Sequence, residues 1–403
     1  MEIGGAEAYY QWIVSCLDGV GEDLPALTAS AEAAAARYVK ADYELGIYGD
    51  EGLVGEILGR SGGPMRLYVE SSTGEMRIGQ PGLKCVILLV LREDNLDAVV
   101  ARAVELRKLG DKLLVGIGRG ELFAKAKAAG LVLDAVLDNH AAPHGGLSPD
   151  GRGVWQVPTD PVASMIVAWA WVAEFVGACT RLGKMPPMYQ GFAVPGGKER
   201  AARIGNIKFH AEKPAPMPPG AVGKEYLAEQ RKDVDAVHKE EMAGMRRVAD
   251  LAMQARQAGK NLYCFVHGHA VLGHIPYPPN DPGFFKRANR SWFDLVKNLR
   301  LAAGDLVFCV GFDTVFQGKE WNNFAENARK DGVKLAWSLT TYRSDDIKTI
   351  PAAEPFIAQH WAFGDAVAAL EGYDVKIIPT GGVQAELVYW MVNAEMLRLA
   401  ARR

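Results

Sequence analysis

The chain has 403 residues, which is enough for two or three domains with complete hydrophobic cores. Hydrophobic residues make up 49% of it and charged residues 23%, a composition typical of soluble globular proteins. The net charge of −3 argues against a nucleic acid or an anionic membrane surface as a partner.

The first half of the chain alternates apolar runs with helical patterns. A long helix is predicted at about 5–39, broken near Gly19–Pro25, and the pattern of 95–110 predicts a helix that ends at Gly110. The run from Val162 to Cys179 is interrupted by Glu174, which favours a buried helix over a membrane span. Strands are predicted at 43–49, 85–91 and 112–118, and "VPTDPVASMIVAWAW" at 157–171 closes this half.

The second half repeats this order about 220 residues later. It has a long helix at about 222–258, a helix at 321–332, and "IPTGGVQAELVYWMV" at 378–392. The spacing is preserved, since Val86 precedes Lys112 by 26 residues and Leu306 precedes Val333 by 27. Its apolar runs lie at 262–268, 306–312 and 333–339.

These patterns predict one α/β fold used twice. Short apolar runs without alternation indicate strands that are buried on both faces, as in a parallel sheet covered by helices. We therefore predict two doubly wound, flavodoxin-like domains in tandem, forming one pseudo-symmetric unit. The first domain is expected at 1–183 and the second at 221–403. Residues 184–220 contain seven prolines and are expected to be a linker that wraps one domain and contributes to a site.

The five cysteines are scattered and none forms a C-x-x-C pair. They predict buried thiols in a reducing cytoplasm and argue against a disulfide framework or a thiolate zinc site. The chain start lacks the charged and apolar segments of a signal peptide, so a cytoplasmic location is expected. The cysteines are Cys16, Cys85, Cys179, Cys264 and Cys309.

Two segments of helix–turn–strand sequence resemble the sugar isomerase (SIS) family of phosphosugar-binding domains. They are "AVELRKLGDKLLVGIG" at 103–118 and "AENARKDGVKLAWSLTTYRSDD" at 325–346. Thr159 and Thr380 fit the place where the family opens its last long helix. The resemblance covers nearly the whole chain apart from the linker. It implies a tandem SIS protein, a homodimer, and an aldose–ketose isomerase reaction on a phosphorylated or amino sugar.

The loops that bind phosphate in that family are altered here. The first copy has Arg92-Glu93-Asp94, which brings two carboxylates to a place where a phosphate needs hydrogen-bond donors. The second copy has "CVGFDTVFQGKEW", in which Gly311 and Thr314 remain as donors but the serines of the family are absent. These changes favour the second copy as the ligand site and the first as a degenerate copy.

Histidines follow the first strand of the second copy in "CFVHGHAVLGH". His267 and His269 are expected at the carboxyl edge of the sheet, where ligands bind in such folds. They could move a proton at neutral pH, or bind a divalent metal together with His274. The alternative is that they are loop histidines hydrogen-bonded to backbone or substrate. We expect no metal cofactor, with these three as weak candidate ligands.

An isomerase needs a base that moves a proton between C1 and C2 of an open-chain sugar. Glu386, in the first turns of the last helix, and His360 are candidates besides His267. Alternatively, Glu386 is a carboxylate favoured by the helix dipole and His360 is a packed histidine. Thr380-Gly381-Gly382 could bind an anion at the helix start or only cap the helix. The predicted substrate-binding residues are His269, Gly311, Thr314, Thr341, Arg343, Thr380, Gly381 and Gln384.

Two further segments each have two possible roles. In the first copy, Asp50, Asn139, His140 and His144 form either a second polar site or, more in keeping with its altered loop, part of a packed, degenerate edge. The aromatic and proline-rich loop 275–285 is either a lid over the second-copy site or a dimer contact. For the whole chain, the alternative to an isomerase is a non-catalytic sugar-phosphate-binding or regulatory SIS protein.

Overall fold

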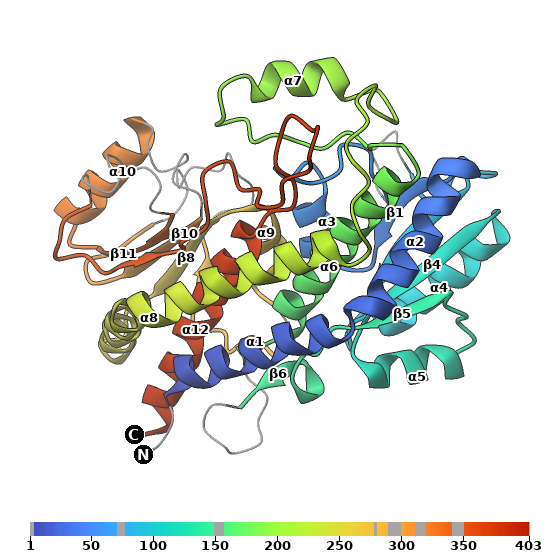
Figure 1. The fold of residues 1–403 in the computed structure, drawn as a ribbon. Helices are drawn as coiled ribbons and strands as arrows, with labels where there is room; N and C mark the ends of the chain where they lie inside the picture. Colours follow the sequence, from blue (N-terminus) through green and yellow to red (C-terminus); the bar gives the residue numbers. More distant parts are fainter. Residues whose placement is uncertain are drawn as a thin grey trace.

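Two parallel five-stranded sheets, one from each half of the chain, form the framework of the protein (Figure 1). The computed structural model describes residues 4–70, 77–148, 157–277, 280–288, 300–311, 319–340 and 350–402. The first sheet contains β1 (Glu44–Tyr48), β2 (Tyr68–Val69), β3 (Cys85–Val90), β4 (Lys112–Gly118) and β5 (Ala135–Asp138). The second contains β8 (Leu262–His267), β9 (Lys286–Arg287), β10 (Leu306–Gly311), β11 (Lys334–Leu339) and β12 (Phe356–Ala358).

The strand order is the same in both sheets. The first sheet runs β2-β1-β3-β4-β5 and the second β9-β8-β10-β11-β12, with every pair in both parallel. In each, the second strand lies on one side of the first strand and the third lies on the other, as in doubly wound flavodoxin-like folds. The predicted fold class, two such domains in tandem, is confirmed.

Long helices lie between the two sheets (Figure 1). They are α1 (Gly5–Glu22), α2 (Leu24–Lys40), α6 (Asp160–Arg181), α8 (Ala221–Gln257) and α12 (Gly381–Ala401). One continuous core joins them to the facing sides of both sheets, with Val86 of β3, Trp171 of α6 and Phe308 of β10 among its members. Because both copies contribute to this core, they form a single packed unit, as the repeat predicted.

The outer faces of the sheets have their own helices. α4 (Leu96–Lys108) and α5 (Gly120–Ala128) cover the first sheet, and α10 (Lys319–Lys330) covers the second (Figure 1). Along β3, Val86 and Leu88 belong to the central core while Ile87 and Leu89 belong to the outer one. Burial on both faces explains why the strands are uninterrupted apolar runs.

Two short helices meet where the halves join. α3 (Glu51–Ile57) and α9 (His269–His274) each follow the first strand of their copy and pack on one another. A Cβ atom on Gly273 would lie 2.4 Å from the Cα of Gly52, so the two backbones touch at a pair of glycines. This close crossing brings residues that follow β1 and β8 into one place.

The apolar helix α6 is buried, as predicted. By length and composition it is the one helix in the described part of the chain that could span a membrane, but its apolar window is entirely buried. Glu174, which interrupts that window, accepts hydrogen bonds from Thr28 Oγ1 (3.1 Å) and from the backbone N–H groups of Gly220 and Gly223 (both 2.8 Å). It therefore holds the start of α8 against α6. All five cysteines are buried free thiols, which confirms that prediction.

The linker contains a helix that its sequence did not reveal, α7 (Gly197–Ile204). The Arg200 guanidinium pairs with both carboxylate oxygens of Asp374 (2.8 and 2.7 Å) and donates to Tyr373 Oη (2.9 Å). The linker is thereby fixed to the segment that precedes α12. The remaining elements, before α6, are η1 (Pro143–Gly145), β6 (Gly146–Leu147) and β7 (Val157–Pro158).

Candidate functional site

The carboxyl ends of β8 and β10 form the point where the second sheet changes direction. His267 and Gly311 are the last paired residues of these two strands. His269 follows at the first position of α9. Ligands of doubly wound folds bind at this position, outside the strand ends. Both predicted histidines therefore lie at the predicted edge, and so does Gly311.

A cavity of about 270 Å³ lies at this edge, and we call it the interdomain pocket. Its walls come from the segment after α3, from the linker, from the end of β8 and the start of α9, and from the loop after β12. Both copies and the linker therefore build it. The described residues that line it are Gly59, Arg60, Ser61, Tyr189, Gln190, Gly191, Phe192, Ala193, Val194, His267, His269, Trp361, Gly364 and Asp365.

The two imidazoles in this pocket are neutral at physiological pH. Burial lowers the pKa of His267 to about 4. Burial and the nearby Arg60 lower the pKa of His269 to about 3. The Nδ1 atom of His269 lies 3.1 Å from the carbonyl oxygen of Gly55 in α3. A neutral ring in that contact donates from Nδ1, so Nε2 is its acceptor atom.

A buried group of charges forms the inner wall. Arg60 is 2% exposed and pairs with Glu56 (Nε to Oε1, 3.2 Å) and with the Asp365 carboxylate. Glu56 also accepts from the backbone N–H of Ala270 (3.2 Å), at the start of α9. Burial raises the pKa of Glu56 to about 7, against the effect of Arg60. Arg60 and Glu56, both from the first copy, thus form and hold in place the inner wall of the pocket.

The predicted anion site at the start of α12 is already filled. Asp365 Oδ1 accepts from the backbone N–H groups of Thr380 (3.2 Å) and Gly381 (2.9 Å). The hydroxyl of Thr380 donates to Asp233 of α8 (2.8 Å). A Cβ on Gly382 would lie 2.0 Å from Glu56 Oε1, so this glycine is needed for packing. The helix start binds the protein's own carboxylate.

His274 lies away from the other two histidines, in the core between the domains. It is fully buried, and its ring nitrogens lie 2.5 Å from Glu386 Oε1 and 2.5 Å from Asp50 Oδ1. Burial acts to lower the pKa of His274, but the two carboxylates outweigh it and raise the pKa to about 10. Asp50 also pairs with Arg92 (2.9 Å), and its pKa is held well below the usual range. Two cations and two carboxylates therefore alternate along this chain of contacts.

Other predicted residues lie elsewhere. Glu386 and Gln384 are fully buried in α12 and are not among the described residues that line the pocket. His360 lies 3.1 Å from Glu241 of α8, a contact that raises its pKa. With Glu240 these two form the one group within the described chain that has the spacing of a metal site, while His267, His269 and His274 do not converge. Thr314, Thr341 and Arg343 lie outside the described residues.

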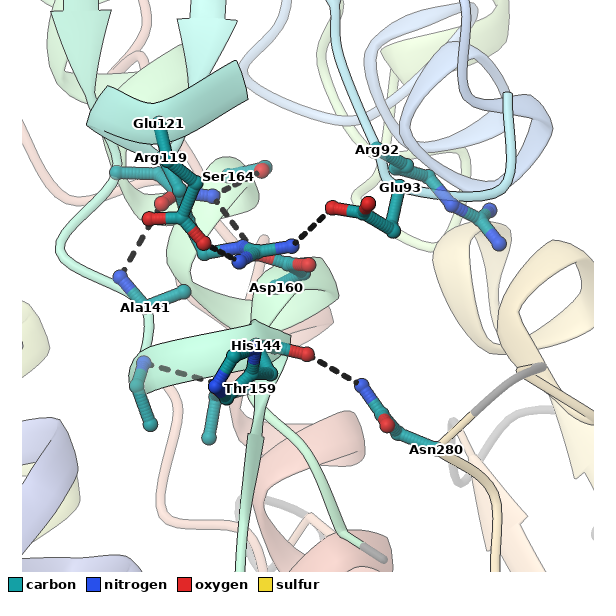
Figure 2. A network of polar contacts seen from close by, with 12 residues as sticks. Arg92, Glu93, Arg119, Glu121, Ala141, His144, Thr159, Asp160, Ser164 and Asn280 are labelled. Atoms are coloured by element: carbon teal, nitrogen blue, oxygen red, sulfur yellow. Dashed lines mark hydrogen bonds and ion pairs between the residues drawn. The ribbon is translucent and has the colours of Figure 1, made fainter. Parts of the chain in front are cut away.

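Ion pairs and hydrogen bonds link the side chains near the start of α6, at the corresponding edge of the first domain (Figure 2). The buried guanidinium of Arg119 contacts Asp160 (3.2 Å), Glu93 (3.4 Å) and Glu121. Asn139 donates to Ser164 (2.9 Å), and His140 to Asp23 (2.9 Å). The charged groups beside these strand ends are thus paired with one another. A separate cavity of about 320 Å³ lies further along the same edge, between the end of β5, the start of α5 and the helices α1 and α2.

Within the loop 275–285, Tyr277 and Asn280 contact this first edge. The ring of Tyr277 lies 4.0 Å from the guanidinium carbon of Arg92. Asn280 donates to the carbonyl oxygen of His144 (3.0 Å; Figure 2). None of the described residues of this loop lines the pocket. The described residues therefore give no support to the alternative of a lid over the second-copy site, because the buried ring of Tyr277 packs on Arg92 of the first copy. The alternative of a dimer contact stays a prediction.

Sequence reasoning missed several wall residues, among them Arg60, Tyr189, Trp361 and Asp365. The linker was expected to contribute to a site, and 189–194 do so. The sequence did not indicate that Arg60 and Asp365 belong to a site. Each follows a segment without clear periodicity, and the two residues are 305 positions apart in the chain. Their pairing depends on how the two copies pack.

No protein-family model matches the chain, and no curated protein matches its sequence. Among solved structures, a protein from Clostridium novyi NT assigned as a tagatose-6-phosphate ketose/aldose isomerase is 8% identical over 99% of this chain and 90% of that one, with a TM-score of 0.55. A protein from Silicibacter pomeroyi DSS-3 assigned as a phosphosugar isomerase is 12% identical over 98% and 97%, with a TM-score of 0.47. The C-terminal domain of glucosamine-fructose-6-phosphate aminotransferase from Francisella tularensis is 9% identical over 96% and 95%, with a TM-score of 0.44. The first of these likenesses shows the fold: the chain has the tandem SIS-type α/β architecture of phosphosugar isomerase structures.

Proposed function

We propose that the protein binds a sugar or a sugar derivative in the interdomain pocket. The observation that carries this proposal is the pair of neutral imidazoles, His267 and His269, in a cavity at the switch point of the second sheet. Small-molecule sites are concave and mostly apolar, with a few placed polar groups. A cavity of about 270 Å³ has room for a monosaccharide.

The chemistry of the walls supports a sugar. Trp361, Tyr189 and Phe192 provide aromatic surface, against which the C–H groups of a sugar ring can pack. Trp361 is fixed in place, since its Nε1–H donates to Gln359 (2.8 Å). The acceptor atom of His269 can receive a hydrogen bond from a hydroxyl group. Contacts from Thr314, Thr341 and Arg343, assembly as a homodimer and a cytoplasmic location stay predictions.

A second candidate function is isomerisation of the bound sugar. It is favoured by His267, which is the one residue of the three predicted acids and bases that lines the pocket. A neutral imidazole can accept the proton that moves between C1 and C2. A pKa of about 4 makes His267 a weak base, and for this reason binding comes first in the proposal.

Proton NMR in heavy water tests both functions with a panel of hexoses, amino sugars and their phosphates. Line broadening that is lost in His269→Ala supports binding, and loss of a C2–H signal that stops in His267→Ala supports isomerisation. His238→Ala is the control, because that histidine pairs with Glu7 and stacks on Tyr10 of α1 and does not line the pocket. If no compound in the panel is broadened or exchanged, the proposed function is wrong.

A further inference from the structure

We infer that Asp365 acts as an internal anion in the second domain, so that the part of the ligand inside the interdomain pocket is uncharged and rich in hydroxyl groups. This inference rests on the proposed function and narrows it: the pocket selects against an anionic group, including the phosphate of a phosphosugar. A phosphate group, where the ligand has one, lies outside this pocket.

The first support is the position of Asp365 itself. It lines the pocket and is 6% exposed, and its carboxylate accepts from the N–H groups of Thr380 and Gly381 and pairs with Arg60. Helix N-termini and arginines are the groups that bind phosphate most readily in proteins. Here Arg60 and the N–H groups of Thr380 and Gly381 already have a carboxylate partner, so an anion that binds to them would have to displace Asp365.

The second support is the balance of charge. Among the described residues that line the pocket, Arg60 and Asp365 carry charge, and they pair with each other. Behind them Glu56 provides a second acidic partner for Arg60. The two imidazoles are neutral. The described wall therefore offers no excess positive charge, and an anion would lose its hydration without gaining an unpaired cation.

The third support is steric. A Cβ on Gly381 would lie 2.9 Å from Asp365 Oδ1 and 3.0 Å from Arg60 Nη2, so these groups fill the space above the helix start. The loop is held from the first copy as well, since Ser61 Oγ donates to the carbonyl oxygen of Gly364 (2.5 Å). This contact holds the backbone next to Asp365 in place between the copies.

The test is binding of inorganic phosphate to the full chain, measured as the rise in Tm with phosphate against chloride at equal ionic strength. Asp365→Ser removes the internal anion, leaves Arg60 with Glu56 as its remaining acidic partner, and exposes the N–H groups of Thr380 and Gly381. We expect its Kd for phosphate to fall at least about tenfold below that of the wild type, as charge-assisted hydrogen bonds form. The gain should vanish in the double variant Arg60→Met/Asp365→Ser.

Asp365→Asn keeps the shape of the side chain and provides a second variant if the serine protein does not fold. We expect a smaller gain from it, about threefold, because the amide still occupies the helix start. The inference is overturned if neither variant gains phosphate affinity. It is also overturned if the wild type already binds phosphate in a way that Arg60→Met abolishes.

The two proposals can fail separately. If the sugar panel gives no binding while Asp365→Ser gains phosphate affinity, the proposed function alone is wrong. If sugars bind but no variant gains phosphate affinity, the inference about charge is wrong and the proposed function stands.

Discussion

The two sheets have the same strand order, but the side chains at their carboxyl edges are arranged differently. In the first domain, Arg119 and Arg92 satisfy the carboxylates around them, and Tyr277 from the second copy packs on Arg92. In the second domain, β8 ends in the neutral His267 and a cavity remains beside it.

The difference shows how one repeated fold can divide its tasks. Ion pairs between side chains of the first edge satisfy the polar groups with which a ligand could otherwise form hydrogen bonds. Neutral imidazoles beside aromatic surface leave a place that is polar enough to orient a ligand and open enough to hold it. Residues of the first domain also help to build the interdomain pocket. The carbonyl oxygen of Gly55 in α3 orients His269, and Arg60 forms part of the pocket wall.

The largest expected effect comes from His274, which joins the two edges. His274→Ala leaves two buried carboxylates without their shared cation and should lower the free energy of unfolding by about 3–5 kcal/mol, measured by urea denaturation. His238→Ala removes a half-exposed pair with Glu7 and should cost less than about 1 kcal/mol. Equal effects of the two substitutions would show that the buried pairs do not join the domains.

The same residue predicts a dependence on pH. The pKa of His274 is raised from 6.5 to about 10 in the folded protein, so its stabilising effect is complete below pH 6.5 and is lost as the pH rises through 10. The free energy of unfolding should therefore fall from pH 7 to pH 10 more steeply in the wild type than in His274→Gln. Parallel pH profiles of the two proteins would contradict the charged state of His274.

The next effect is steric and lies at the edge of the second domain. Gly382→Ala would place a methyl group 2.0 Å from Glu56 Oε1 and should destabilise the protein by about 1–3 kcal/mol. Gly21→Ala is the matched control, because nothing lies within 4 Å of its Cβ in α1. There alanine should stabilise the helix by up to about 1 kcal/mol. Thermal unfolding followed by circular dichroism measures both.

The two edges should also differ in binding. His269→Ala is expected to weaken the affinity for a sugar found in the panel about tenfold, since a hydrogen bond of about 1.4 kcal/mol is lost. Arg119→Met, at the edge of the first domain, should lower stability and leave the affinity unchanged. Calorimetric titration separates these outcomes, and a ligand that loses affinity in Arg119→Met would place a site in the first domain.

The smallest effect is expected where the loop 280–285 contacts the first domain. Asn280→Ala removes the hydrogen bond to the carbonyl oxygen of His144 and should cost about 1 kcal/mol of stability. Sugar affinity should not change, because this residue does not line the pocket. A change in affinity without a change in stability would indicate that the loop acts as a lid after all.

The sequence by itself determined the architecture. Apolar runs of strand length, helical periodicity and a repeat near 220 residues predicted two parallel sheets with helices on both faces, because burial on both faces imposes that pattern locally. Short elements such as α3, α9 and α7 carried too few residues for a periodic signal. Histidines at the end of β8 were predicted at the ligand edge for the same local reason, namely that side chains after parallel strands collect there.

Only the tertiary structure decided which charges meet. Glu386 was expected at the site, but the packing of α12 on α9 pairs it with His274 in the core. The start of α12 was expected to bind an anion, and a loop residue 16 positions earlier fills it. Arg60 and Asp365 meet across the interface between the copies. Such pairs depend on the three-dimensional approach of distant segments, and no local pattern of residues records that approach.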